Sequence, residues 1–246
     1  MSDDGYFDEA VAARYDSDHG GTDPKLIELT ADTLRDLAGG GAALEFAIGT
    51  GRIALPLTER GVPVKGIELS KAMVARLREK DGGADIEVAI GDMTTTQVDG
   101  RFSLVFLVFN TIDNLTTQAM QVACFRNAAA HLEPGGRFVI ETGVPPIQRM
   151  PYGETKRAFA CSDTHWGIDT FDVVTQQYAS HHIWIEDGQH SRLSVPFRYV
   201  WPSELDLMAQ LAGLELEHRW GGWDRAPFTA TSTKHVSVWR KLADRP

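Results

Sequence analysis

The amino-acid sequence predicts an α/β fold built on a mostly parallel sheet, and two observations lead to this prediction. Segments typical of strands and helices alternate over residues 42–142, as parallel strands joined by crossover helices require. After Thr142, an apolar–polar alternation of period two replaces helical spacing as far as Trp201. We therefore expect a parallel core followed by an antiparallel β insert.

The first expected core element is an amphipathic helix over residues 24–38, which the glycines 39–41 end. Four strand–helix units follow, with strands at 42–48, 62–68, 85–90 and 101–109. Helices are expected at 52–60, 70–80 and 116–132, and a short polar connection follows the third strand. Ser70 is expected to cap its helix, and a turn at 133–136 leads into a fifth strand at 137–142.

In the insert, residues 186–189 indicate a hairpin turn, and Pro196 indicates an edge strand or a bulge. One apolar face is expected from Leu193, Val195, Phe197, Tyr199 and Trp201. Ser203 is expected to cap a helix that runs to Ala212, and two strands, 214–220 and 235–241, complete the chain. We expect 1–41 to form a helical cap region, 42–142 the core, 143–201 the insert, and 202–246 the final helix and hairpin of a single domain.

The composition narrows the range of possible functions and locations. The 246 residues carry a formal charge of −10, and the 34 acids outnumber the 24 bases without any long basic run, which argues against a nucleic-acid partner. No apolar run is long enough for a membrane span, and the first residues lack the pattern of a signal peptide, so we expect a cytoplasmic protein. Cys124 and Cys161 lack metal-ligand spacing and are expected to be free thiols, and the histidines form no metal-binding set.

The most informative motif is Glu45-Phe-Ala47-Ile-Gly49-Thr50-Gly51, which joins a strand to a helix. A strand that turns sharply into a helix beneath a ligand needs residues without a Cβ, and Gly49 and Gly51 meet that need. The helix that follows would direct unpaired N–H groups at a phosphate or carboxylate. Such turns also serve NAD, FAD and purely structural roles, so the motif alone leaves these alternatives open.

Two further acids favour a nucleoside-containing ligand. Glu68 ends the second strand, near the spacing of roughly 20 residues expected for a carboxylate that binds a ribose diol. Asp92 follows the third strand, where it could accept a hydrogen bond from the amino group of adenine. Met93 and Leu69 would then pack against the ring faces.

The ordered set Glu45-x-Ala47-x-Gly49-Thr50-Gly51, Glu68 and Gly91-Asp92-Met93 resembles the class I S-adenosylmethionine-dependent methyltransferases, over residues 40–142 and the tail. The resemblance implies a Rossmann-like, seven-stranded sheet with a closing antiparallel hairpin. It also implies that the glycine loop contacts the methionine part of the cofactor, that Glu68 holds the ribose and that Asp92 holds adenine. Ala47 departs from the usual glycine, and the acid Glu45 differs from the apolar residue usual in dinucleotide folds. The residues assigned to the cofactor are Tyr15, Glu45, Ala47, Gly49, Thr50, Gly51, Glu68, Leu69, Met73, Asp92, Met93, Phe109 and Asn110.

The pair Phe109-Asn110 is similar to small-molecule methyltransferases and lacks the Asn-Pro-Pro-aromatic sequence of enzymes that methylate bases. Some similarity to amino-sugar N-methyltransferases favours a small metabolite, methylated on N or O by in-line displacement. A general base is not required, because the methyl group is already activated; His165, His181 and His182 are candidates if one is used. The acceptor-side candidates are Asn110, Glu141, His182, Trp184 and Tyr199.

Two other functions stay open at this point. A module that binds S-adenosylmethionine without catalysis would carry the same motifs, and a nucleotide-dependent oxidoreductase would use the same glycine loop. The oxidoreductase does not account for Glu45 or Asp92. The sequence does not decide the oligomeric state, and a homodimer is compatible with it.

Overall fold

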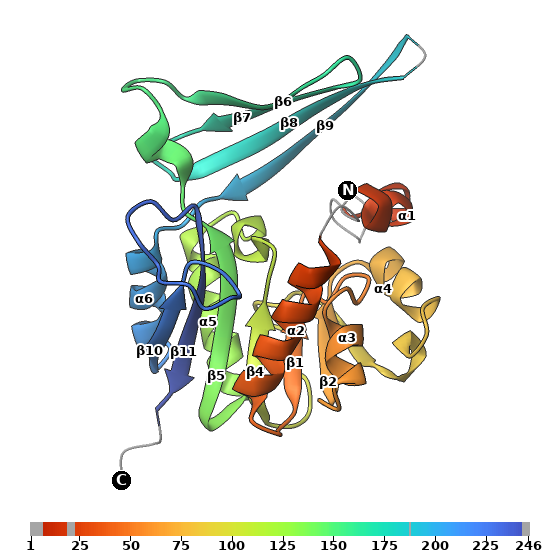
Figure 1. Cartoon of the computed structure of the whole chain (residues 1–246), viewed down its shortest axis with the longest axis vertical. Helices are drawn as coiled ribbons and strands as arrows, with labels where there is room; N and C mark the ends of the chain where they lie inside the picture. Colours follow the sequence, from red (N-terminus) through yellow and green to blue (C-terminus); the bar gives the residue numbers. More distant parts are fainter. Residues whose placement is uncertain (1–6, 19–22, 187, 243–246) are drawn as a thin grey trace.

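The computed structural model of the chain describes residues 7–18, 23–186 and 188–242. These residues form a seven-stranded sheet in the main body and a four-stranded sheet that projects above it (Figure 1). The seven strands lie in the order β10-β11-β5-β4-β1-β2-β3. This order confirms the predicted fold class, a Rossmann-like and mostly parallel sheet with an antiparallel insert after the fifth strand.

Five parallel strands form the body of the larger sheet: β1 (Ala43–Phe46), β2 (Val64–Glu68), β3 (Glu87–Ile90), β4 (Phe102–Leu107) and β5 (Leu132–Gly143). β1 lies in the middle, between β2 and β4, and all four of its residues are buried. The chain direction across the sheet reverses at this point, and open α/β sheets bind their ligands at such a switch. β5 begins earlier than predicted, because the 133–136 turn is included in it with a shift of register.

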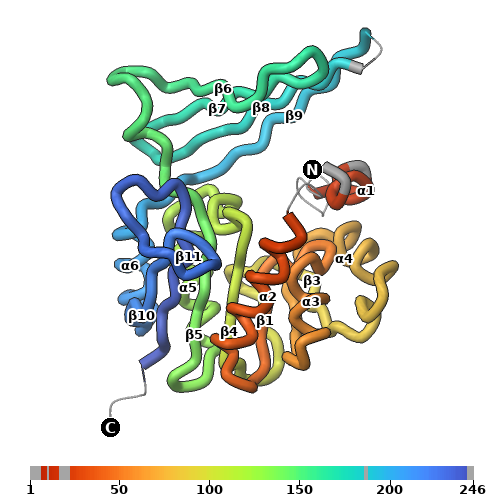
Figure 2. The backbone as a smooth tube through the Cα atoms, in the orientation of Figure 1, coloured from red at the N-terminus to blue at the C-terminus, as the bar shows by residue number. Residues whose placement is uncertain are grey.

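Helices cover both faces of this sheet. α2 (Pro24–Ala38) and α3 (Ala54–Glu59) bury Leu34 and Leu57 in one apolar cluster with Phe106 of β4. α5 (Gln118–His131) and α6 (Pro202–Leu211) bury Phe125 and Leu205 in a second cluster on the opposite face. Figure 2 shows α2 in front of the central strands. The remaining helical elements are α1 (Glu9–Asp18), α4 (Lys71–Arg78), and three short 3-10 turns, η1 (Gly83–Asp85), η2 (Thr111–Asn114) and η3 (Pro146–Arg149).

Helix starts follow local capping chemistry, with one correction. The Ser70 hydroxyl accepts a hydrogen bond from Met73 N at 3.1 Å, which confirms Ser70 as the cap of α4. The prediction that Ser203 caps α6 is wrong, because the helix begins one residue earlier, at Pro202. Proline suits the first helical position, since its ring fixes φ and its missing N–H is not needed there.

The insert is a four-stranded antiparallel sheet, β6-β7-β8-β9, made of Lys156–Cys161, His165–Phe171, Gln177–Glu186 and Gln189–Arg198. β8 and β9 form the predicted hairpin around residues 186–189, of which Asp187 lies outside the described residues. Pro196 lies on β9, an edge strand as predicted. β10 (Leu214–Trp220) and β11 (Lys234–Lys241) then form the closing antiparallel hairpin beside β5.

Both cysteines are free, and Cys124 is buried while Cys161 is exposed. In the described part of the chain, every helix is too short or too polar to traverse a bilayer. Across the same residues, no three His, Cys, Asp or Glu side chains gather in an arrangement that could hold a metal ion.

Candidate active site

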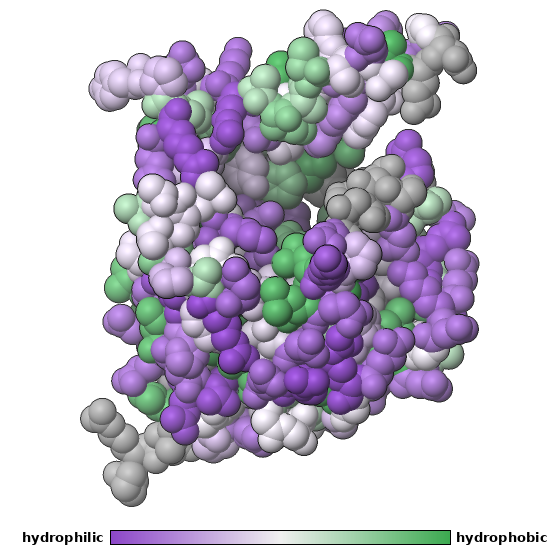
Figure 3. Space-filling view, viewed as in Figure 1, coloured by the Kyte–Doolittle hydropathy of each residue, from purple (hydrophilic) through white to green (hydrophobic). Residues whose placement is uncertain are grey.

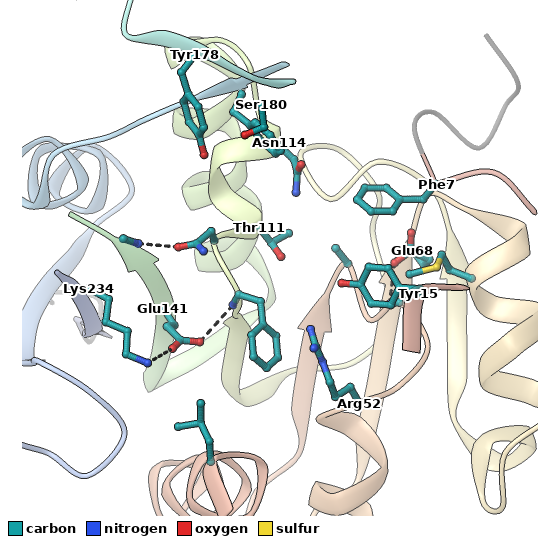
Figure 4. A pocket seen from close by; sticks show the side chains of 18 of the residues that line it. Phe7, Tyr15, Arg52, Glu68, Thr111, Asn114, Glu141, Tyr178, Ser180 and Lys234 are labelled. Carbon is teal, nitrogen blue, oxygen red and sulfur yellow. Dashed lines mark hydrogen bonds and ion pairs between the residues drawn. The ribbon is translucent and has the colours of Figure 1, made fainter. Parts of the chain in front are cut away.

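A cavity of about 890 Å³ lies at the carboxyl ends of the parallel strands, with the insert as its roof. The space-filling view is hollowed between the insert and the main body, and apolar residues line part of the upper wall (Figure 3). The volume lies within the range of roughly 300–1,000 Å³ typical of ligand pockets. The residues that line it come from the N-terminal segment, the start of α2, the glycine loop, the end of β2, the start of α4, the ends of β4 and β5, the insert and the start of β11 (Figure 4).

The glycine loop after β1 lies on the cavity floor, and its two glycines have different roles. Gly49 has φ 58° and lines the cavity, where a Cβ would project to 3.4 Å from Met73 Cε, another lining residue. Gly51 has φ 79°, but a Cβ there would lie 2.3 Å from Leu77 Cδ1 of α4. Gly51 is therefore required by helix packing, and Gly49 by the shape of the floor. Ala47 also has a positive φ of 52°, which a non-glycine residue adopts only when its surroundings hold it there.

Glu68, at the end of β2, holds this loop. Its Oε2 accepts a hydrogen bond from Gly49 N at 2.8 Å, and its Oε1 accepts one from Ser70 N at 2.9 Å. The side chain is 6% exposed and lines the cavity. A buried carboxylate thus stands at the position predicted for a ribose-binding acid, already oriented by two backbone donors.

Helix α1 closes one side of the cavity. The Asp16 carboxylate accepts a hydrogen bond from Thr50 Oγ1 at 2.6 Å and pairs with Lys80 Nζ at 2.7 Å. These contacts fix the helix over the glycine loop and place Tyr15 in the cavity wall. The Thr50 hydroxyl, predicted to serve the cofactor, therefore holds α1.

An aromatic and cationic cluster lies beneath Tyr15. The Arg52 guanidinium stacks over the Phe109 ring at 3.7 Å from its centroid and lies 5.7 Å from the centroid of Tyr15. Glu45 is buried close to this cluster, and within the described residues its Oε2 has no hydrogen-bond partner. Burial raises the pKa of Glu45 well above its usual range, although the charge of Arg52 opposes the shift.

Three predicted adenine-side residues lie away from this cavity. Leu69 is 48% exposed, and Asp92 is partly buried with Oδ1 accepting a hydrogen bond from Thr94 N at 2.7 Å. A hydrogen bond from Gly91 N to Glu68 O keeps Asp92 close to the end of β2. Met93 packs in the apolar cluster with Phe46 and Ile67 and is 9% exposed.

The ends of β4 and β5 form the other side of the cavity floor. Phe109 and Asn110 are consecutive left-handed residues, with φ of 57° and 59°. Asn110 Oδ1 accepts a hydrogen bond from Gly143 N at 2.7 Å, and the Asn110 N–H donates to Glu141 O at 3.2 Å. Glu141 Oε2 accepts from Phe109 N at 3.3 Å, and its Oε1 lies 3.4 Å from Lys234 Nζ. Two of the five predicted acceptor-side candidates, Asn110 and Glu141, line the cavity.

Residues of the insert that were not predicted form the roof. Tyr178, Ser180 and Phe197 line the cavity, whereas His182, Trp184 and Tyr199 do not. Tyr178, Ser180, His182 and Trp184 share one face of β8, but the last two lie four and six residues nearer the hairpin tip than Tyr178. At roughly 3.3 Å per residue, that distance carries them beyond the cavity. The alternating pattern identified the correct face of the strand but not the part of it that meets the core.

Each roof hydroxyl donates its proton to a carboxylate. The Tyr178 hydroxyl donates to Asp113 Oδ2 at 3.0 Å, and the Ser180 hydroxyl donates to Asp169 Oδ1 at 2.6 Å. Asp113 lies on η2 and also accepts a bond from Thr142 Oγ1 at 3.4 Å. Burial raises the pKa of Asp113 to about 7, and burial likewise raises the pKa of Asp169. The sequence signal for Asp113 was its place three residues after Asn110, at the end of β4.

Residues 43–136 match the family described as a methyltransferase domain. Over nearly its whole length the chain is also similar to the solved structure of the CcbJ methyltransferase from Streptomyces caelestis. The identity is 36%, the TM-score is 0.87, and the match covers 99% of this chain and 100% of that one. The chain belongs to the S-adenosylmethionine-dependent methyltransferases.

Two further proteins similar to this methyltransferase come, like the CcbJ methyltransferase, from Streptomyces. The cypemycin N-terminal methyltransferase of a Streptomyces species is 27% identical over 248 residues, which cover 97% of this chain and 98% of that protein. The dTDP-3-amino-3,6-dideoxy-alpha-D-glucopyranose N,N-dimethyltransferase of Streptomyces fradiae is 32% identical over 135 residues, 53% of this chain and 52% of that protein. S-adenosylmethionine is therefore the cofactor of the enzyme, and its residues fit that group: Gly49 leaves space on the floor and Glu68 presents an oriented carboxylate.

The raised pKa of Asp113 predicts a pH-dependent stability difference between the methyltransferase and its Asp113→Asn variant. The folded protein holds the proton up to about pH 7, whereas the unfolded chain releases it near the ordinary value of 3.8. The stabilisation from Asp113 is thus complete below about pH 3.8 and is lost as the pH rises to 7.

Denaturant unfolding of both proteins between pH 4.5 and 8 measures this difference. The free energy of unfolding of the wild type should fall relative to that of the variant, by at most about 1.4 kcal/mol per pH unit, and the difference should be constant above pH 7. A difference that is the same at every pH would contradict the assignment.

Proposed function

We propose that this enzyme transfers the methyl group of S-adenosylmethionine to an amine nitrogen of a small-molecule or short-peptide acceptor. The observation that carries the proposal is the pair of roof hydroxyls. Tyr178 and Ser180 both donate their protons to carboxylates, so their oxygens offer lone pairs to the cavity. Such a roof accepts hydrogen bonds, and an amine provides the N–H groups to match it. The names of the cypemycin and amino-sugar relatives, an N-terminal methyltransferase and an N,N-dimethyltransferase, agree with this proposal.

We assign the cofactor to the floor. Glu68 would hold the ribose diol, Gly49 would allow the methionine part to approach the backbone, and Tyr15 would cover it from α1. Asp92 and Leu69, beyond the end of β2, would receive adenine. The other cofactor positions in the proposal are Glu45, Ala47, Thr50, Met73, Phe109 and Asn110, with Gly51 and Met93 as support from helix packing and the core.

Bound S-adenosylmethionine supplies a methyl group that the sulfonium already activates. The task left to the protein is to align the acceptor nitrogen opposite the leaving sulfur and to exclude water, which can contribute up to roughly 7–11 kcal/mol. In the proposal, residues 1–41 cap the cofactor and residues 143–201 cover the acceptor. The Lys234 ammonium, 3.4 Å from Glu141, adds a positive group to the acceptor side.

The remaining parts of the proposal concern partners and location. We expect no nucleic-acid or membrane partner, because the formal charge is −10 and basic residues are in the minority. A cytoplasmic location agrees with two free cysteines. A homodimer is compatible with the fold.

The choice of acceptor predicts turnover on amines. A panel of matched pairs, each an amino sugar or a peptide with a free N-terminus beside its hydroxyl counterpart, should give methylated product and S-adenosylhomocysteine with amines only. Mass spectrometry of both products measures the result. Methylation confined to the hydroxyl compounds would contradict the proposed acceptor, and cofactor binding without any turnover would indicate a non-catalytic module.

The cofactor assignment predicts opposite outcomes for two glycines. Gly49→Ala and Gly61→Ala both place a Cβ at a positive φ, 58° and 80°, so they carry similar backbone strain. Only Gly49 lines the cavity, whereas Gly61 is exposed and has no atom within 4 Å of the added carbon. Calorimetry should show at least tenfold weaker S-adenosylhomocysteine binding for Gly49→Ala, about 1.4 kcal/mol, and no change for Gly61→Ala. Equal affinities for the two variants would rule out the loop as the cofactor cradle.

The roof assignment predicts that the insert controls the acceptor. Phe197 lines the cavity and its ring lies 4.9 Å from that of Tyr178, whereas Phe159 packs on His182 nearer the tip and does not line the cavity. Phe197→Ala should raise the acceptor KM at least fivefold and change S-adenosylhomocysteine affinity by less than about threefold, under 1 kcal/mol. Phe159→Ala should leave both constants unchanged. A loss of cofactor affinity in Phe197→Ala with normal acceptor KM would show that the insert is not the acceptor roof.

A further inference from the structure

The insert and the core meet at a hydrogen-bonded pair, Tyr178 and Asp113, which has no part in the proposed cofactor site. Tyr178 comes from β8 and lines the cavity, while Asp113 lies behind it on η2 and is 7% exposed. The Tyr178 ring is held between the Phe171 and Phe197 rings, with centroids at 5.4 and 4.9 Å. Figure 4 shows the Tyr178 hydroxyl directed down into the cavity from the insert. The Tyr178 oxygen therefore faces the cavity on one side and the Asp113 carboxylate on the other.

The surroundings leave Asp113 as the proton acceptor of this pair. Thr142 donates to its other oxygen, and the positive charge that lowers its pKa is Arg198 of β9, whose Nη2 pairs with Glu204 of α6 at 2.7 Å. On β7, Asp169 carries a second carboxylate near Tyr178, but Ser180 binds it. Burial, with the nearby charge of Asp113 as a second cause, raises the pKa of Tyr178, so the phenol stays neutral and can only pass a proton on.

The need for such a group follows from the chemistry of the acceptor. An amine is mostly protonated at neutral pH and has no lone pair for the methyl carbon until it loses that proton. A carboxylate in direct contact would form an ion pair with the ammonium, whereas a carboxylate behind a hydroxyl receives the proton at a distance from the reacting nitrogen. Because the pKa of Asp113 is raised to about 7, it lies nearer to that of an amine than an ordinary aspartate does.

We propose that the Tyr178 hydroxyl contacts the acceptor nitrogen and relays its proton to Asp113, so that the enzyme accepts the amine in its protonated form. This proposal rests on the proposed amine N-methylation. The N–H bond of the ammonium breaks as the Tyr178 oxygen takes that proton, and the Tyr178 O–H bond breaks as the Asp113 carboxylate takes the phenolic proton. The electron pair left on nitrogen forms the bond to the methyl carbon, and the pair of the broken C–S bond leaves on sulfur.

The cycle then closes without any other reactant. The methylated product leaves as an ammonium ion, and Asp113 returns its proton through Tyr178 to water. Tyr178 is thus the catalytic residue in contact with the acceptor, and Asp113 is a positioning residue that acts through it. The Ser180 hydroxyl, on the same face of β8 and bound to Asp169, accepts a second N–H of the acceptor.

The relay is tested by the pH dependence of kcat/KM, measured with the panel amine that the wild type methylates fastest. The wild type should show a bell-shaped profile that rises through about pH 7, where Asp113 ionises, and falls at the pKa of the amine. Tyr178→Phe and Asp113→Asn can use only the neutral amine from solution. Their kcat/KM at pH 7 should be at least tenfold lower for an amine whose pKa is about 8, and the deficit should close as the pH passes that value.

A control variant and the pH dependence of the deficit separate the relay from a structural role. Tyr152→Phe, at a fully exposed tyrosine, should keep the wild-type profile, and S-adenosylhomocysteine affinity should be unchanged in all variants. If Asp113→Asn fails to fold, Tyr178→Phe, which keeps the ring between Phe171 and Phe197, carries the test alone. A deficit of the same size at every pH would show a merely structural role and overturn the relay while N-methylation stands. If no panel amine is methylated, the proposed function fails and the relay fails with it.

Discussion

The active site of this methyltransferase depends on one buried carboxylate, Glu68. Its two oxygens accept hydrogen bonds from Gly49 N after β1 and Ser70 N before α4, and its own carbonyl oxygen accepts one from Gly91 N after β3. A charge buried without partners is costly, and these donors offset that cost. The same bonds fix the ends of three neighbouring strands and the start of a helix relative to one another. The shape of the cavity floor is therefore set by the residue that also presents acceptor oxygens to it.

The opposite part of the floor keeps its shape through strain that the surrounding contacts oppose. Consecutive left-handed residues such as Phe109 and Asn110 cost of order 1–3 kcal/mol each outside glycine. Two hydrogen bonds hold this conformation and join the end of β4 to that of β5: Asn110 N donates to Glu141 O, and Asn110 Oδ1 accepts from Gly143 N. The floor and the roof come from separate segments of the chain. Two Streptomyces proteins similar in sequence to this chain carry names with different acceptors.

What the sequence predicted well was local. The strand–helix alternation, the glycine turn and the Ser70 cap depend on neighbours in the chain, and the structure contains each of them. What it predicted poorly depended on where distant elements meet. The period of two identified the face of β8 that includes His182 and Trp184, but only packing against η2 determines that Tyr178 reaches the cavity.

Asp113 joins the two halves of the site, and this position explains its chemistry. It follows the left-handed residues of the floor, accepts a bond from Thr142 of β5, and accepts another from Tyr178 of the roof. Burial is the largest cause of its raised pKa, and the hydrogen bond from the Tyr178 hydroxyl opposes that shift. A carboxyl group exposed to water would return to its ordinary proton affinity. The contact that joins the insert to the core therefore also adjusts the proton affinity of the group behind the roof.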